Sequence, residues 1–375
     1  MTARTRPSCR LDGLCRRRAT QPNHDDTEGP IASAGHSLLL RVLKCFVGAV
    51  VVATVLLSIA YAVRDPGTWW LELARYLPYP IYLLATVMSL LASLWLGRPW
   101  RIAALLALGL VTTVVMGLVW GSPDKGSHRV RVMTYNVKSY LADDRPESYG
   151  RIAWEVLWND PDILVLQDAR HLIDSKGAMP QPVLRMFDDR TIYSYGQYIV
   201  ASRHTLRDCG PREISFRGHA HTYARCVVVA HGVELELITA HFLSPREGLN
   251  ATRHGGVAGL DDWQQNFEDR MTQARALAAA VAASRTPVIV AGDLNAAEGS
   301  PVVRALLDAG LRDTFSSAGK GYGYTHGHSL RVGVSFLRID HILVSPTIGV
   351  IGSFVGSKQG SEHRPVIADL WLERE

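Results

Sequence analysis

Three long apolar segments occupy the first third of the chain, at residues 45–63, 77–96 and 102–120. Each has about the ~20 residues that an α-helix needs to cross the hydrocarbon core of a bilayer. Aromatic residues stand at or near the segment ends, as they do at membrane interfaces: Trp69, Trp70, Tyr76, Tyr79, Trp100 and Trp120. The pattern predicts three transmembrane helices within residues 37–121. The alternative is a buried helical hairpin in a soluble domain. A cleaved signal peptide is not expected, because the first apolar segment begins late and two more follow.

Basic residues near the apolar segments predict their orientation. Residues 1–36 lack apolar periodicity and are expected to form a disordered tail. This tail and the start of the first helix carry Arg16, Arg17, Arg18, Arg41 and Lys44, and the short loop after the second segment carries Arg98 and Arg101. The positive-inside rule places both regions in the cytoplasm. Three crossings then put the rest of the chain outside the cytoplasmic membrane, behind a linker at residues 122–129.

Beyond the linker, short β-branched runs end in polar side chains. The runs at 130–136, 163–168, 235–241 and 288–293 deliver Asn136, Asp168, His241 and Asp293, and Asn295 follows the last one. Open sheets place their chemistry at the carboxyl ends of such strands. Two later segments supply Asp340 and His363, and a carboxylate beside a histidine is a common way to build a general acid or base. Each ending alone is more typical of an ordinary strand-to-loop transition, whereas the set indicates an active site.

Taken together and in their order, six motifs resemble the endonuclease/exonuclease/phosphatase superfamily. They are Thr134-Tyr135-Asn136-Val137, Leu166-Gln167-Asp168, Thr239-Ala240-His241-Phe242, Gly292-Asp293-Leu294-Asn295, Arg338-Ile339-Asp340 and Ser361-Glu362-His363-Arg364-Pro365. The superfamily includes pancreatic deoxyribonuclease, abasic-site endonucleases, neutral sphingomyelinases and inositol polyphosphate 5-phosphatases. The resemblance implies a catalytic domain at residues 130–375 with an α/β fold. That fold is a four-layered α/β sandwich of two packed mixed sheets with outer helices, here preceded by three transmembrane helices.

The resemblance also implies a role for each polar residue, in divalent-metal-dependent hydrolysis of a phosphoester or phosphoanhydride. The expected metal ligands are Asp168, Asn136 and Glu362. Oxygen ligands suit Mg²⁺ or Mn²⁺, and no Cys/His cluster suggests zinc. Asp293 and Asn295 are expected to position the water and the phosphate, His241 to donate to a phosphate oxygen, and His363, held by Asp340, to act as base or electrostatic partner. Whether Asp293 or His363 is the general base stays open.

Two positions depart from the superfamily pattern. Asp168 stands where the superfamily usually has Glu, and Glu362 stands where it usually has Asp. Since one carboxylate retracts and the other extends, the pair is interpreted as a reciprocal swap that keeps the charge of the site. The alternatives are a partial loss of metal affinity and, as a function of another class, a catalytically disabled membrane scaffold.

Two further features concern the catalytic domain itself. Residues 266–284 form an amphipathic, Ala-rich pattern that predicts a helix, with Arg270 and Gln273 placed as the superfamily often has them. Cys209 and Cys226 lie in a stretch that indicates neighbouring strands. They form either a disulfide in an oxidising compartment or two free buried thiols.

Charge and geometry bear on the substrate. Residues 1–127 carry 13 Lys and Arg against 7 Asp and Glu, and residues 128–375 carry 27 against 28. A near-neutral catalytic domain makes nucleic acid a less favoured partner, since duplex binding needs a basic footprint. The short linker keeps the site near the outer leaflet, which favours a lipid-linked phosphate. The chain is also similar to a membrane-anchored bacterial branch of the superfamily associated with teicoplanin resistance. This likeness implies undecaprenyl pyrophosphate as substrate and a link to glycopeptide resistance, with a phospholipase C-like phosphodiesterase or an extracellular nuclease as alternatives.

Overall fold

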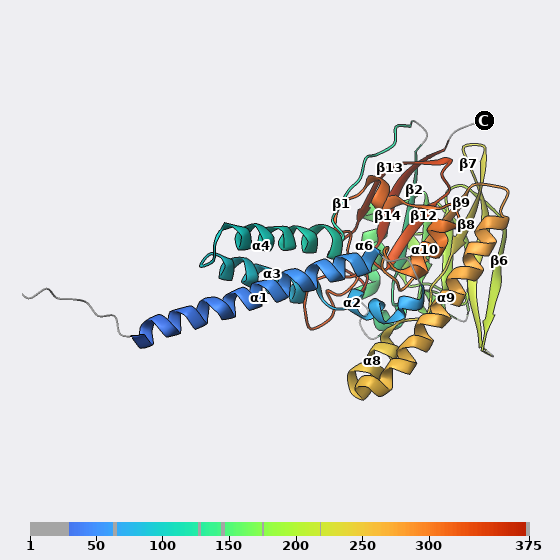
Figure 1. Cartoon of the computed structure of the whole chain (residues 1–375). Helices are drawn as coiled ribbons and strands as arrows, with labels where there is room; N and C mark the ends of the chain where they lie inside the picture. The colour runs from blue at the N-terminus through green and yellow to red at the C-terminus, as the bar shows by residue number, and fades with distance from the viewer. Residues whose placement is uncertain are drawn as a thin grey trace, which may run out of the picture.

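The computed structural model describes residues 30–62, 66–126, 129–143, 147–174, 176–217 and 219–372. Residues 1–29 of the tail predicted to be disordered lie outside the described residues, and the prediction is wrong for residues 30–36, which form the start of helix α1 (Pro30–Ala62). In Figure 1 the first helices project away from a body of strands and helices that holds the rest of the chain. The two parts correspond to the apolar and the mixed regions of the sequence.

The projecting part contains three apolar helices, α1, α3 (Tyr79–Ser93) and α4 (Arg98–Leu110), and α4 continues into a π-helical turn at Val111–Val115. Two stretches, His36–Ala62 and Arg98–Val115, are long and apolar enough to cross a membrane alone. Helix α3 passes that test only together with Trp69–Arg75, from which it is bent by 76°. The structure therefore offers two or three membrane-crossing candidates where the sequence predicted three.

The helix predicted at residues 102–120 is wrong at its carboxyl end. The helical turns stop at Val115, Gly117 takes a left-handed φ of 70°, and Val119–Trp120 form strand β1. Strand β1 pairs with β11 (Lys320–Gly321). The reason is that Gly117 adopts a φ that breaks the helix at no steric cost, and the chain then hydrogen-bonds to the body.

Two six-stranded mixed sheets form the centre of the body. The first has the order β13 (Ile348–Val355), β14 (Val366–Leu372), β2 (Arg129–Asn136), β3 (Ile163–Gln167), β5 (Tyr198–Ser202) and β4 (Thr191–Tyr195). The second has the order β10 (Arg312–Asp313), β12 (Asp340–Val344), β9 (Val288–Asp293), β8 (Val233–Thr239), β7 (His219–Ala230) and β6 (Thr205–Phe216). Pairs β2–β3 and β8–β9 are parallel, and the remaining pairs within these two sheets are antiparallel.

Side-chain alternation along the central strands creates four layers. On β2, Val130 and Val132 enter the core between the two sheets, whereas Met133 and Tyr135 face the helices outside the first sheet. Strand β9 shows the same division between the inner core and an outer helix layer. Because both faces are covered, these strands are apolar at nearly every position. The predicted four-layered sandwich is confirmed.

Outer helices cover each sheet. The first sheet is covered by α5 (Ser139–Asp143), α6 (Glu147–Asn159) and α7 (Gln181–Arg185), whose apolar side chains fill one outer core. The second is covered by α9 (Leu260–Ala283) and α10 (Pro301–Asp308). Helix α9 includes the helix predicted at 266–284 up to Ala283, and Ser284 is its C-cap. The other helical segments are η1 (Pro66–Leu71), α2 (Glu72–Arg75), η3 (Arg170–Leu172), α8 (Arg246–Gly255), η4 (Gly256–Gly259) and α11 (Thr314–Ala318).

The segment predicted as a linker, residues 122–129, lies against the catalytic body as far as it is described. Asp124 accepts from Arg312 at 2.6 Å, and its backbone N–H donates to Val350 at 2.8 Å. Just before it, the Gly121 N–H donates to Gly319 at 2.8 Å. The chain is therefore attached to the domain directly after the helices.

The two cysteines of the catalytic body, Cys209 on β6 and Cys226 on β7, form a disulfide. Strand β6 is bulged between Arg207 and Gly210, where the bridge is made. Of the alternatives that the sequence left open, the structure has the bridge.

Candidate active site

Polar side chains from both sheets meet at one end of the sandwich. Asn136 ends β2 in the first sheet, Asp293 ends β9 in the second, and Asp340 begins β12 directly opposite Asp293 in the strand register. His241, just after β8, forms an isolated parallel β-bridge with Asp293 through the backbone. His363 lies in the connection from β13 to β14. The strand endings chosen from the sequence therefore converge.

Asp293 lies at the centre of this cluster and is only 1% exposed. The Asn136 side-chain amide donates to its Oδ2 at 2.9 Å, and the Asn295 backbone N–H donates to its Oδ1 at 2.9 Å. Asn295 in turn donates from its own side chain to the carbonyl of Phe242 at 2.9 Å. These hydrogen bonds satisfy the buried carboxylate and hold it in one position.

Gly292, immediately before Asp293, has a packing role. A Cβ atom at this position would lie 2.0 Å from the carbonyl oxygen of Ala240. Only glycine therefore allows β9 to approach the end of β8 closely enough for His241 and Asp293 to lie side by side.

His363 and Asp340 form the predicted pair. His363 Nδ1 lies 2.9 Å from Asp340 Oδ2, and His363 Nε2 lies 3.8 Å from Asp293 Oδ2. A carboxylate that accepts from Nδ1–H leaves Nε2 as the nitrogen that can take up a proton. Burial lowers the pKa of His363 to about 4 and raises the pKa of Asp340 to about 7. The imidazole is therefore held neutral near pH 7, as a general base requires.

Asp168 stands at the edge of the cluster beside a lysine. Lys138 Nζ lies 3.1 Å from Asp168 Oδ2, and His241 Nδ1 lies 3.6 Å from Asp168 Oδ1. Burial opposes ionisation of Asp168, but His241 and Lys138 outweigh it and lower its pKa. The Gln197 side-chain oxygen accepts from His241 Nδ1 at 2.7 Å, which directs Nε2 toward Asp293, 3.4 Å away.

Three residues of the site have left-handed backbone conformations. The φ angles are 46° at Lys138, 52° at Asp168 and 48° at Asn295. Such conformations are uncommon for residues other than glycine and gather at functional sites, where the surrounding contacts maintain them. Here they turn the chain sharply after the strands and bring side chains of the connecting loops back to the cluster.

The donor set fits a hard divalent cation. Atoms of Asp293, Asp340 and His363 all lie within 4.8 Å of one another. Asn136 faces Asp293 with its amide nitrogen, and its Oδ1 accepts from the Lys138 backbone N–H at 3.2 Å. Oxygen-rich sets of this kind suit Mg²⁺ or Mn²⁺, which would neutralise phosphate charge and polarise the bond that breaks. The fit agrees with the expected divalent metal but does not distinguish the two ions.

The three residues expected as metal ligands, Asp168, Asn136 and Glu362, are not among the three that the geometry groups, and their role as ligands stays a prediction. Glu362 lies apart from the cluster in its contacts. Its backbone carbonyl accepts from His326 Nδ1 at 3.2 Å. Burial lowers the pKa of His328, and the Glu362 carboxylate partly opposes this by raising it. His326 itself packs on His363, with ring centroids 4.6 Å apart. The role of Glu362 as a ligand stays a prediction, and so does the reciprocal swap with Asp168.

The sequence did not predict Lys138, Gln197 or Tyr76 as parts of the site. Lys138 follows Asn136 by two positions, so its proximity to the motif was the only signal available. Gln197 and Tyr76 stand in segments with no motif of their own, and their contacts span large separations in sequence.

Tyr76 comes from the segment between the apolar helices. Its hydroxyl donates to the backbone carbonyl of Asn295 at 2.7 Å, and the fully buried Arg270 donates to Tyr76 at 2.7 Å and to the same carbonyl at 3.2 Å. The Tyr76 ring also packs edge-on against Trp263. The helices that precede the catalytic domain thus contribute a direct support of a catalytic loop.

A cavity of about 660 Å³ opens beside the cluster. Its lining is mixed: it includes the polar residues Lys138, Gln197, His241, Arg246, Glu247 and His363 and the largely apolar residues Tyr76, Leu249, Leu330, Phe336, Leu337 and Ile339. The site can therefore hold a phosphate group against the polar residues and an apolar group next to it.

Comparison with known proteins agrees with this geometry. The model of the endonuclease/exonuclease/phosphatase family matches residues 133–363, and the chain belongs to that family. Among solved structures, a mannosyl-6-phosphatase from Bacteroides thetaiotaomicron VPI-5482 is similar, with 17% identity, a TM-score of 0.50, and coverage of 65% of this chain and 100% of that one. TDP2 from D. rerio, in complex with a single-strand DNA product, is similar with 16% identity, a TM-score of 0.51 and the same coverage. A search of curated protein sequences gave no match.

The structural likenesses establish the fold alone, and the family establishes the chemistry. Its members are metal-dependent phosphoesterases and nucleases. The chain is accordingly a metal-dependent hydrolase that acts on phosphoester or phosphoanhydride bonds.

Removal of either central acid–base group should abolish most of the activity. We expect Asp293→Ala and His363→Ala each to lower kcat at least about a hundredfold, because general acid–base groups contribute roughly 10²–10⁴. The measurement is phosphate release by the full chain with Mg²⁺ or Mn²⁺. The exposed residues Asp188 and His254 provide matched controls as Asp188→Ala and His254→Ala. Undiminished activity in both site variants would contradict these roles, and no turnover by the wild type, with no further loss in the variants, would favour the disabled scaffold.

The Asp340 carboxyl should make stability depend on pH. Because its pKa is raised to about 7, the group stabilises the folded state fully below its unfolded pKa of about 4, and this contribution is lost as the pH rises through about 7. Between those pH values we expect the free energy of unfolding of the metal-free wild type to fall relative to Asp340→Asn. Thermal unfolding in the presence of a chelator measures it, and parallel pH curves for the two proteins would contradict the assignment.

Loss of the Tyr76 hydroxyl should disturb Asn295 without altering substrate binding. In Tyr76→Phe, Arg270 and the Asn295 carbonyl lose a buried partner, a change worth ~1–3 kcal/mol. We expect kcat to fall roughly tenfold with KM little changed. If Tyr76 contributes only to stability, the variant should have a lower melting temperature and an unaltered kcat at a temperature well below it. The exposed Tyr195 provides the control as Tyr195→Phe.

Proposed function

We propose that the protein hydrolyses a lipid-linked phosphate at the outer face of the cytoplasmic membrane, with a pyrophosphate such as undecaprenyl pyrophosphate as substrate. The observation that carries the proposal is the position of Tyr76. This residue belongs to the segment between the apolar helices, lines the catalytic cavity and hydrogen-bonds the loop of Asn295. If the apolar helices are inserted in a bilayer, the cavity lies next to the surface of that bilayer.

The mixed lining of the catalytic cavity supports a substrate of this kind. An amphiphile with a phosphate head and an apolar chain matches a cavity lined both by basic and polar groups and by Leu330, Phe336 and Ile339. Burial of the apolar group adds affinity that a free phosphate lacks. The near-neutral charge of residues 128–375 supports a small head group over a long polyanion.

The hydrolysis itself exchanges one phosphorus–oxygen bond for another. Water attacks a phosphorus atom, the bond to the bridging oxygen breaks, and the products are the lipid monophosphate and inorganic phosphate. His363 accepts the proton of the water at Nε2, with Asp340 stabilising the imidazolium, or Asp293 accepts it. Asn295 and His241 orient the phosphate oxygens, and a bound divalent cation would supply charge neutralisation.

The exposed surface of the apolar helices supports anchoring in a membrane. Leu84, Trp95 and Leu106 are 63%, 69% and 65% exposed, an arrangement typical of helices that face lipid. Within the described residues, Arg98 and Arg101 at the start of α4 support a cytoplasmic position for the loop between α3 and α4. A link to glycopeptide resistance rests on the resemblance of the sequence alone.

The substrate proposal predicts a clear order of activities. At equal enzyme concentration we expect phosphate release from undecaprenyl pyrophosphate to exceed head-group release from phospholipids and cleavage of plasmid DNA. Asp293→Ala provides the background rate for each assay. Efficient cutting of DNA with intact lipids would overturn the proposal and leave a membrane-tethered nuclease. Release of phosphorylated head groups would indicate a phospholipase C-like enzyme.

The membrane orientation predicts where the carboxyl terminus lies and the state of the two cysteines. A reporter fused after Glu375 should be active only if it is a reporter that works outside the cytoplasm. Cys209 and Cys226 should resist alkylation until a reductant is added, whereas Cys45 in α1 should not depend on the reductant. Activity of a cytoplasmic reporter together with two freely alkylated thiols would reverse the topology.

A further inference from the structure

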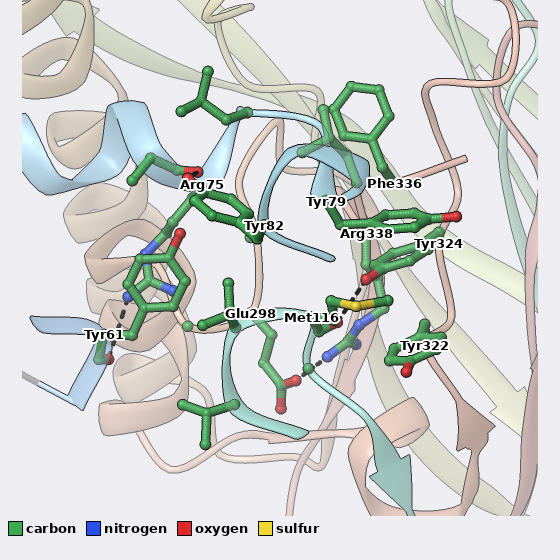
Figure 2. Close-up of a pocket in the computed structure, with 18 of the residues that line it drawn as sticks. Tyr61, Arg75, Tyr79, Tyr82, Met116, Glu298, Tyr322, Tyr324, Phe336 and Arg338 are labelled. Atoms are coloured by element: carbon green, nitrogen blue, oxygen red, sulfur yellow. Dashed lines mark hydrogen bonds and ion pairs between the residues drawn. The ribbon is translucent and has the colours of Figure 1, made fainter. Parts of the chain in front are cut away.

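A second cavity, of about 460 Å³, lies where the apolar helices meet the catalytic domain. We call it the junction cavity, and Figure 2 shows its walls. The ends of the apolar helices supply Tyr61, Tyr79 and Met116, and the catalytic domain supplies Glu298, Tyr324 and Phe336. The residues assigned to the reaction, around Asp293 and His363, include none of these side chains.

The charged groups around the junction cavity are held by other groups of the protein. Arg75 Nε lies 2.8 Å from Glu72 Oε1, and the Arg75 guanidinium lies over the Tyr61 ring, 4.1 Å from its centroid. Arg338 pairs with Asp313 at 2.9 Å and with Glu298. Arg304, the third arginine of the lining, donates from Nε to the Gly299 carbonyl at 3.4 Å. Since Arg75 and Arg338 already face carboxylates, these two arginines are less available to an anionic ligand.

Aromatic and apolar side chains form the rest of the wall. The rings of Tyr79, Tyr324 and Tyr322 are stacked in a row, with centroids 5.5 and 5.3 Å apart and interplanar angles of 16° and 7°. Figure 2 shows Tyr79 and Tyr324 lying face to face on one side and Met116 between them and the opposite wall. Val114 and Val115, at the end of the third apolar helix, also line the cavity. Such a surface accommodates hydrocarbon by dispersion contacts.

The junction cavity adjoins the catalytic cavity. Phe336 and Leu337 line both of them, so these two residues form a shared wall. Tyr76 lines the catalytic cavity, and its chain neighbours Arg75 and Leu77 line the junction cavity. The two cavities are therefore neighbours, with Phe336 and Leu337 between them.

We propose that the junction cavity binds the first part of the hydrocarbon chain of the lipid phosphate substrate and thereby selects long-chain substrates over short ones. This inference rests on the proposed function, because it assumes that a lipid-linked phosphate binds at the polar cluster around Asp293. The junction cavity then contributes to substrate affinity, and the polar cluster around Asp293 carries out bond cleavage.

The test compares pyrophosphates that share a head group and differ in chain length. Isopentenyl, farnesyl and undecaprenyl pyrophosphate are hydrolysed by the full chain in detergent micelles. We expect kcat/KM of the wild type to rise at least about tenfold from the shortest to the longer chains, because burial of about two methylene groups already gives that factor. Val114→Trp, at a lining position that is 43% exposed and has room for a larger side chain, should remove this increase and leave the rate on isopentenyl pyrophosphate unaltered.

A matched variant separates occupation of the cavity from a general effect on the helices. Val52→Trp places the same side chain on α1 at a position that is 57% exposed and does not line the junction cavity. This variant should retain the preference for long chains. Retention of that preference in Val114→Trp, or an equal loss on all three substrates, would overturn the inference. A wild type that hydrolyses isopentenyl pyrophosphate and leaves the long chains intact would instead overturn the proposed function, and the inference with it.

Discussion

The carboxylate of Asp293 is the group on which the site depends, because it is buried and must be held in place by partners from both sheets. Asn136 reaches it from β2, His241 from the end of β8, and His363 from the connection before β14. The contacts of Asn136 and His363 require the two sheets to be packed face to face, whereas His241 follows the strand next to β9 in the same sheet. The inner core of the sandwich therefore fixes the active site as well as the stability of the domain.

The apolar helices and the catalytic domain form one structure at the site. Tyr76 supports the Asn295 loop, Trp263 of α9 donates to the backbone of Trp69 at 3.2 Å, and strand β1 extends a small sheet with β11. A hydrolase that acts on membrane lipids gains from such an arrangement, because the anchor sets the distance and the orientation of the site relative to the bilayer. The contacts also explain why the segment after the helices is bound to the domain over its described length.

The sequence predicted those parts of the site that come directly after strands. Asn136, His241 and Asp293 follow β-branched runs, and the geometry of a mixed sheet brings such positions to one edge. Lys138, Gln197 and Tyr76 could not be found in this way, since loops with left-handed turns and a separate helical segment place them. The last turn of the third apolar segment was misplaced for a related reason. Hydropathy continues to Trp120, and only pairing with β11 reveals the strand there.

Lys138 provides a physical reason for Asp rather than Glu at position 168. The shorter carboxylate stays at the rim of the cluster, where the Lys138 ammonium lies 3.1 Å away and lowers its pKa together with His241. Asp293 and Asp340, by contrast, are bonded to amide and imidazole groups. Atoms of Asp293, Asp340 and His363 lie within 4.8 Å of one another, a spacing that would suit one divalent cation. Asp168 lies outside this group, so its role as the main metal ligand stays a prediction.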